Sequence, residues 1–233
     1  MTRLPVRLAS LIAALAPAIA TPVVAGAQPV VVELFESQGC SSCPPANANL
    51  AAIAGRPDVI ALNFAVTYWD GPGWTDTFGS KRYTARQWDY AHAFRHAQVF
   101  TPQVVVDGRR DGVGINTADF TQLVGRGTAA PATPALKLSG GAVSIGAGPR
   151  RAAAADVWLA RYDPRTLQVA IRGGENGGRT LPHKNIVREL VRLGDWNGTA
   201  ETLRLPPAHA RGLTDAVLVQ LPKGGPILAA AKG

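Results

Sequence analysis

A strand pattern, a pair of cysteines and a helix pattern follow one another near the start of this chain, and that succession most constrains its fold. Residues 29–35 form an apolar run rich in β-branched side chains, which is typical of a buried strand. Cys40 and Cys43 follow and are the two cysteines of the chain. Residues 46–54 then favour a helix. The sequence therefore predicts a strand that delivers a dithiol to the beginning of a helix.

This spacing and context indicate thiol–disulfide exchange. The cysteines have no second pair with which to build a zinc site or a disulfide framework. We expect Ser42 to cap the helix, with Pro44 and Pro45 in its first turn. Cys40 then lies where helix N–H groups favour a thiolate. We predict that Cys40 is nearer to solvent and attacks or is attacked, and that Cys43 resolves the mixed disulfide.

Residues 1–27 have the pattern of a signal peptide. Arg3 and Arg7 form a basic start, residues 8–20 are apolar, and residues 25–27 form a small-x-small cleavage site. The apolar run is too short to span a membrane comfortably. We therefore expect a mature chain without an integral membrane segment. Its predicted location is periplasmic or secreted, where disulfides persist.

The charge distribution argues against nucleic acid as a partner. The formal net charge is +8, and removing the predicted signal takes away Arg3 and Arg7 and no acid, which leaves +6. The basic residues are scattered and are not interleaved with aromatic residues. His92 and His96 are four apart, but Ala93 stands where the metalloprotease pattern needs glutamate. We predict no metal site and no cofactor.

The composition divides the mature chain into two predicted domains. Residues 127–134 form a linker rich in Gly, Ala and Pro. Residues 28–126 alternate strand and helix patterns, which predicts an α/β domain. Residues 135–233 carry short strand patterns separated by Gly and Pro, which predicts an all-β, sandwich-like domain.

Two acids flank the cysteine motif and are candidates for proton handling. Glu33 and Glu36 lie on the predicted strand, and an acid near the pair could take a proton from the resolving thiol. Successive side chains of a strand alternate, so these two residues point to opposite faces. Only one of them can lie near the sulfurs, and the sequence leaves open which one.

Several other residues have an ordinary structural interpretation beside a functional one. Trp69 and Trp74 either line a peptide groove near the dithiol or pack an inserted loop. Residues 173–178 are glycine-rich but lack the context of a phosphate-binding loop, so we predict a plain turn. We expect His183 and His209 at the surface.

The order of elements, with Thr101 and Pro102 before the third predicted strand, resembles the thioredoxin superfamily. The resemblance implies a thioredoxin-like fold for residues 28–126, with a cis Pro102 facing the dithiol. It also implies that the backbone of Thr101 pairs with an incoming peptide and that the proline shields the sulfurs from metal. Trp69 is a further candidate for substrate binding.

The resemblance narrows to a bacterial exported family called domain of unknown function 1223. The segments that carry it are residues 31–35, 37–46, 68–74, 101–103, 174–177 and 185–188. The family implies a thioredoxin-like fold without a settled activity. Thr67 stands where we expect an acid in many members of the family. If that acid handles protons, its role passes to Asp70 here or is lost.

The leading hypothesis is an exported thiol–disulfide oxidoreductase that acts on a thiol- or disulfide-bearing protein or on a small thiol. One alternative is a periplasmic Cu(I) carrier, because two thiolates suit that ion. The other is a binding module in which the β-rich half does the work and the dithiol is a relic.

Overall fold

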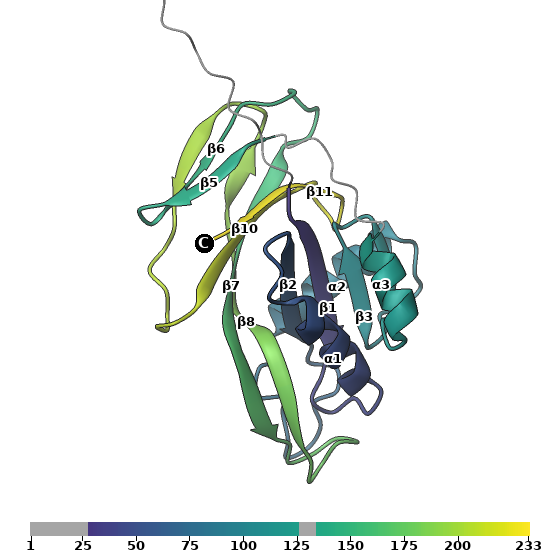
Figure 1. Cartoon of the computed structure of the whole chain (residues 1–233). Helices are drawn as coiled ribbons and strands as arrows, with labels where there is room; N and C mark the ends of the chain where they lie inside the picture. The colour runs from purple at the N-terminus through teal and green to yellow at the C-terminus, as the bar shows by residue number, and fades with distance from the viewer. Residues whose placement is uncertain (1–27, 126–133) are drawn as a thin grey trace, which may run out of the picture.

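The computed structural model describes residues 28–125 and 134–233 (Figure 1). The predicted signal peptide and residues 127–133 of the predicted linker lie outside the described residues, so both assignments stay predictions. No helix in these two ranges is long and apolar enough to cross a membrane.

A mixed sheet of eight strands dominates the described chain, and three short helices accompany it. Its strand order is β11-β10-β7-β8-β2-β1-β3-β4, and β5, β6 and β9 form a separate three-stranded sheet. The elements are β1 (Val30–Glu36), α1 (Cys43–Ile53), β2 (Val59–Ala65), α2 (Lys81–Ala93), β3 (Gln103–Val106), β4 (Arg110–Gly112), α3 (Thr117–Gly125), β5 (Leu136–Ser139), β6 (Ala142–Ile145), β7 (Ala155–Ala170), β8 (Thr180–Trp196), β9 (Glu201–Arg204), β10 (Thr214–Gln220) and β11 (Ile227–Lys232).

The predicted fold class, a thioredoxin-like α/β domain followed by an all-β domain, was wrong. The main sheet is continuous across the predicted boundary, because β8 pairs in parallel with β2 at Ile186 and Asn63. The two halves also share one apolar core, in which Phe35 and Phe64 lie with Val187 and Leu218. Strands β7 and β8 have 16 and 17 residues and form one long hairpin that runs beside the first half (Figure 1). The second half therefore extends a single, mostly β structure.

The helices cover the two faces of the sheet around β1. Side chains of a strand alternate between faces, so Val32 and Leu34 pack with α1 and α3, whereas Val31 and Phe35 pack on the side of α2. Figure 1 shows α1 and α3 in front of the sheet and α2 behind it. The face on which a β1 side chain lies therefore decides which helix it meets.

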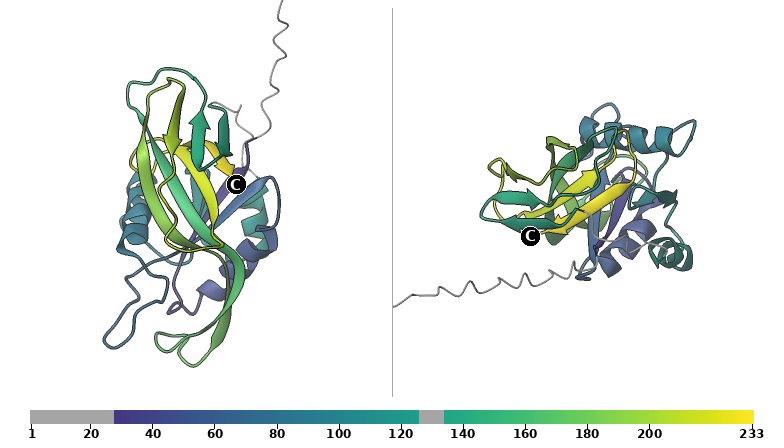
Figure 2. Two further views of the ribbon diagram at one scale, coloured as in Figure 1. Left: turned by 90° about the vertical axis from the view of Figure 1, so that its left-hand side faces the viewer. Right: turned by 90° about the horizontal axis from the view of Figure 1, so that it is seen from above.

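The three-stranded sheet packs against the end of the main sheet that lies away from the helices (Figure 2). Val143 and Ile145 of β6 meet Val157 and Leu159 of β7 in a separate apolar cluster, together with the buried Trp196. This second layer supports the upper part of the β7–β8 hairpin and leaves the hairpin's tip free to reach the first half of the chain.

Local signals predicted most element boundaries well. Ser80 caps α2 by accepting a hydrogen bond from the backbone N–H of Arg82. The helix ends at Ala93, and Arg95 has a φ of 63°. Asn116 caps α3 by accepting hydrogen bonds from the backbone N–H groups of Ala118 and Asp119.

Candidate functional site

The site is built around Cys40 and Cys43, which form a disulfide between the end of β1 and the first residue of α1. Their Cα atoms are 5.5 Å apart. The exposed fractions of Cys40 and Cys43 are 0% and 1%. The expectation that Cys40 lies nearer to solvent was therefore wrong.

The tip of the β7–β8 hairpin covers the cysteine motif, and we call residues 173–178 the cap. The backbone N–H of Glu175 donates to the carbonyl of Gly39 at 2.9 Å. In return, the backbone N–H and the hydroxyl of Ser41 donate to one carboxylate oxygen of Glu175, at 3.0 and 2.7 Å. The hydrogen bond from the Ser41 hydroxyl, followed by the one from the Ser41 N–H, holds the pKa of Glu175 below its usual value of 4.5.

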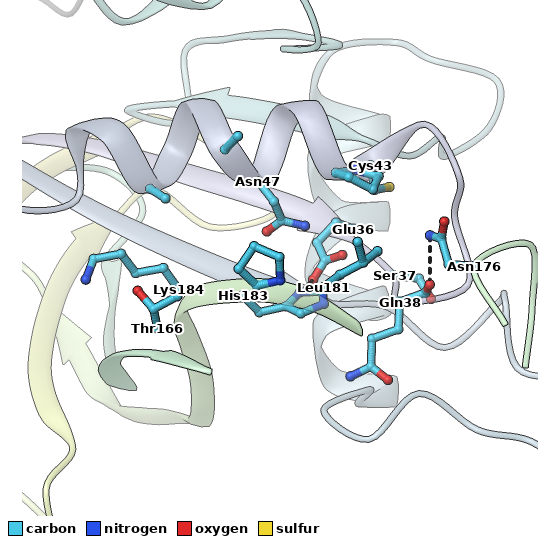
Figure 3. Close-up of a pocket in the computed structure, with 14 residues that line it drawn as sticks. Glu36, Ser37, Gln38, Cys43, Asn47, Thr166, Asn176, Leu181, His183 and Lys184 are labelled. Carbon is cyan, nitrogen blue, oxygen red and sulfur yellow. Dashed lines mark hydrogen bonds and ion pairs between the residues drawn. The ribbon is translucent and has the colours of Figure 1, made fainter. Parts of the chain in front are cut away.

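A buried amide completes the attachment of the cap. The Nδ2 group of Asn176 donates to the carbonyls of Gln38 and Cys40, at 3.0 and 2.8 Å. Asn176 is 1% exposed, so both hydrogen bonds form away from bulk water. Figure 3 shows its side chain beside the motif, next to the label of Cys43. The cap and the motif are therefore joined by five hydrogen bonds.

Glycine is required where the cap touches the motif. Gly174 has a φ of +67°, and a Cβ atom there would lie 2.5 Å from the Cα atom of Gly39. The plain turn predicted for residues 173–178 is therefore docked on the backbone of the cysteine motif. Local sequence predicted the turn from its glycines but carried no signal for its contact, because the partners are more than 130 residues away.

The structure places Glu33 and Glu36 on opposite faces of β1, as alternation requires. Glu33 faces α2, where Arg86 Nε lies 2.6 Å from its Oε1 and Tyr90 also donates to it. Glu36 faces α1 and lines the same cavity as Cys43. Of the two candidate acids, Glu36 is therefore the one on the side of the disulfide.

Glu36 pairs with His183, a residue that we expected at the surface. Their Oε1 and Nδ1 atoms are 3.3 Å apart, and the exposed fractions are 1% and 2%. Burial opposes the charged imidazole, but the Glu36 carboxylate and, further away, Asp76 raise the pKa of His183 above its usual 6.5. Among residues 28–125 and 134–233, neither the other oxygen of Glu36 nor Nε2 of His183 has a hydrogen-bond partner.

A cavity of about 90 Å³ lies between α1 and β8 beside the disulfide (Figure 3). Cys43, Glu36 and His183 line it, and the exposed Thr166 and half-buried Lys184 lie at the end away from Cys43. A space of this size holds several water molecules, since one water needs roughly 10–15 Å³ of such volume. The unpartnered atoms of Glu36 and His183 are the kind of groups that bind such waters.

Asp76 organises the loop before the cysteines, and the sequence analysis missed it. Its carboxylate accepts hydrogen bonds from the Ser37 hydroxyl at 3.0 Å and from the Gln38 N–H at 2.7 Å. Burial, followed by the nearby Glu36 charge, raises the pKa of Asp76 above 3.8. Asp70 accepts from the Asp76 backbone N–H at 2.9 Å and so positions Asp76.

The remaining predicted site residues form a second connection to the motif. Trp69 Nε1 donates to the Thr101 hydroxyl at 2.8 Å, and the bond between Thr101 and Pro102 is cis, as the resemblance implied. A Cβ atom on Gly39 would lie 3.4 Å from Cβ of Trp69 and 3.1 Å from the ring of Trp74. Trp69 therefore joins the loop beside Cys40 to the Thr101–Pro102 turn.

Within residues 28–125 and 134–233, no group of three or more His, Cys, Asp or Glu side chains is arranged to hold a metal ion.

Comparisons with known proteins place the chain in a family. Residues 31–220 match the family described as "Protein of unknown function (DUF1223)", and the chain belongs to this family. A crystal structure of an Agrobacterium tumefaciens protein is similar at 32% identity, with a TM-score of 0.68 over 87% of this chain and 92% of that one.

A more distant likeness concerns the fold alone. HBP35 of Porphyromonas gingivalis has 16% identity and a TM-score of 0.51, over 88% of this chain and 74% of that one. No curated protein matches the chain significantly.

Proposed function

We propose that this protein is an exported thiol–disulfide oxidoreductase whose working group is the Cys40–Cys43 disulfide. The observation that carries the proposal is the setting of this disulfide at the start of α1, beside a buried acid–base pair, Glu36 and His183. Such a pair is unnecessary for a purely structural crosslink. The signal-like pattern of residues 1–27 supports export, to a compartment where disulfides form.

The proposed reaction is a pair of thiol–disulfide exchanges. A partner thiolate attacks Sγ of Cys40, and the Cys40–Cys43 bond breaks with its electron pair on Sγ of Cys43. Cys43 takes up a proton. A second partner thiolate then attacks the partner's sulfur in the mixed disulfide and releases Cys40, so two partner thiols become one disulfide and the protein becomes a dithiol. The reverse sequence reduces a partner disulfide and returns Cys40 and Cys43 to the disulfide.

Glu36 and His183 supply the proton in this proposal. The imidazole Nε2 is without a hydrogen-bond partner in the described part of the chain, and His183 lines the cavity that Cys43 also lines. Water in that cavity can carry a proton from Nε2 to the Cys43 thiolate, and Glu36 stabilises the imidazolium before the transfer. In the reverse direction His183 accepts the proton and Cys43 becomes the nucleophile. Asp70 acts indirectly, by holding Asp76 beside this pair.

The partner is a thiol- or disulfide-bearing molecule, positioned beside Cys40. Trp69, Thr101 and Pro102 are the residues proposed to hold it, because the Trp69–Thr101 hydrogen bond connects them to the loop that contains Gly39.

A redox titration tests the proposal. The purified mature chain is equilibrated with defined ratios of reduced and oxidised glutathione, and free thiols are alkylated and counted by mass spectrometry. A reversible transition with a midpoint between about −270 and −120 mV is expected for a working dithiol. A midpoint below about −300 mV, the range of structural disulfides, contradicts the proposal.

Single-cysteine variants provide the cellular counterpart. Cys43→Ser is expected to accumulate mixed disulfides through Cys40, because the resolving thiol is gone. Adducts that dithiothreitol releases would appear on a non-reducing gel, and Cys40→Ser/Cys43→Ser is the matched control. Stoichiometric Cu(I) in the purified reduced protein, with no adducts, would favour the carrier hypothesis instead.

A further inference from the structure

The burial of both sulfurs constrains how a partner reaches them. Exchange requires a third sulfur in contact with the disulfide, yet Cys40 is 0% exposed and the cap is hydrogen-bonded to its carbonyl. If the proposed function holds, the chain packed around the motif has to move before a protein thiol can attack Cys40, and the cap is the segment hydrogen-bonded to residues 38–41. The following inference rests on that function and names the partner.

Removing the cap frees a row of backbone groups along the motif. The carbonyls of Gln38, Gly39 and Cys40 lose the N–H groups of the cap, and the N–H of Ser41 loses its acceptor. Gln38, Gly39 and Cys40 are buried, and buried backbone groups without partners are costly, so a bound partner would replace the lost hydrogen bonds. The donors and acceptors that the cap presents to the motif therefore indicate which groups the partner has to present.

We propose that the cap occupies the binding site of a protein partner, and that this partner is an extended segment with an acidic side chain next to its cysteine. The segment displaces residues 173–178. Its N–H groups replace the backbone N–H of Glu175 and the side-chain amide of Asn176 on the motif carbonyls, and its carboxylate replaces that of Glu175 on Ser41.

The acidic requirement comes from the contacts of Ser41. Two donors, its backbone N–H and its hydroxyl, converge on one carboxylate oxygen. Ser41 precedes the first turn of α1, and its hydrogen bonds lower the pKa of Glu175, which shows that they favour the ionised acid. A neutral side chain at this place accepts weaker hydrogen bonds than a carboxylate does.

The extended backbone comes from the spacing of the acceptors. The cap contacts carbonyls of three consecutive residues, Gln38, Gly39 and Cys40, and reaches the adjoining Ser41 as well. A small thiol reaches only one of these groups at a time. A peptide that lies along the motif reaches several of them, as strand-like recognition of backbone groups generally does.

Two matched peptides test the inference on the full mature chain. Each is a capped pentapeptide with one central cysteine, flanked by glutamate in one and by glutamine in the other. The measured quantity is the rate at which each peptide forms a mixed disulfide with the oxidised protein. Each rate is divided by the rate of the same peptide with a small-molecule disulfide, which removes differences in intrinsic thiol reactivity.

For the unmodified protein we expect the glutamate peptide to react about threefold to tenfold faster, the range for the net contribution of one hydrogen bond, because the Ser41 site is solvent-exposed. Ser41→Ala removes one of the two donors and should at least halve this preference. Glu175→Gln weakens the cap and should accelerate both peptides while the preference remains. Asp119→Asn, an exposed acid on α3, is the matched control and should change neither rate.

Equal normalised rates for the two peptides, with Glu175→Gln no faster than Asp119→Asn, would overturn the inference while leaving exchange itself intact. If dithiothreitol does not reduce the disulfide reversibly, the proposed function is contradicted, and the inference that rests on it is contradicted as well. A preference for the glutamine peptide would also overturn the inference, because the carboxylate would then hinder binding.

Discussion

Replacing Gly174 by alanine tests whether the cap controls access to the disulfide. The new Cβ atom would lie 2.5 Å from the Cα atom of Gly39, a backbone atom that cannot rotate away. The cap therefore cannot dock as it does in the unmodified protein. We expect the disulfide of Gly174→Ala to be reduced faster by dithiothreitol.

Gly178 offers a matched control in the same cap. Its φ is +83°, similar to the +67° of Gly174, but a Cβ atom at Gly178 would meet nothing within 4 Å. Both alanines carry the strain of a left-handed backbone, which costs roughly 1–2 kcal/mol. Only the Gly174 variant adds a collision with the motif, so the difference between the two isolates the contact of cap and motif.

The magnitude follows from the hydrogen bonds that docking makes. The two buried bonds of Asn176 contribute about 1 kcal/mol each, or about 2 kcal/mol together. If the docked state loses about 2 kcal/mol relative to the open state, the population of the open state rises roughly 30-fold. If reduction proceeds through the open state, Gly174→Ala should be reduced up to about 30-fold faster than Gly178→Ala, which carries similar backbone strain without the collision.

The assay quenches the reaction with an alkylating reagent at set times and measures the reduced fraction by mass. Urea unfolding of the oxidised proteins, followed by tryptophan fluorescence, verifies that both variants are folded. Equal reduction rates for Gly174→Ala and Gly178→Ala would refute the reasoning, because access to the sulfurs would then not depend on the cap.

Three further changes have expected outcomes. His183→Gln should flatten the pH dependence of the free energy of unfolding. Because the pKa of His183 is raised in the folded state, its protonation stabilises the fold fully below about pH 6.5, and this stabilisation is lost as the pH rises through the raised pKa. Urea unfolding at several pH values measures the change. Arg86→Met should destabilise the fold by about 3–5 kcal/mol, because it leaves the Glu33 carboxylate buried without its ion pair; a cost below 1 kcal/mol in urea would contradict this. Leu50→Ala, in the core beneath α1, should cost about 2–5 kcal/mol in urea and leave the glutathione midpoint unchanged.

The sequence predicted the elements around the cysteines because their signals are local. The apolar run before Cys40 forms β1, and Ser42 stands at the N-cap of α1 with proline in the first turn, although its side chain makes no capping hydrogen bond. The alternation of side chains on β1 also placed Glu33 and Glu36 on opposite faces. Each of these results depends on residues a few positions apart, where backbone geometry and side-chain chemistry act without the rest of the chain.

The predicted fold class was wrong because strand pairing is not a local property. The patterns of β7 and β8 predict strands, yet nothing in them specifies that Ile186 pairs with Asn63 of the first half. A sandwich and an extension of the first sheet bury similar apolar faces. The choice between them depends on the shared core around Phe64 and Val187, which exists only in the folded chain.

By itself the sequence determined the dithiol, its place between strand and helix, and the candidate acids on β1. Only the tertiary structure decided that Glu36 faces the disulfide and that His183 joins it from β8. It also decided that Glu175 covers the motif. These contacts join residues more than 130 positions apart, so they depend on how the long hairpin docks on the first half, and local chemistry cannot specify that.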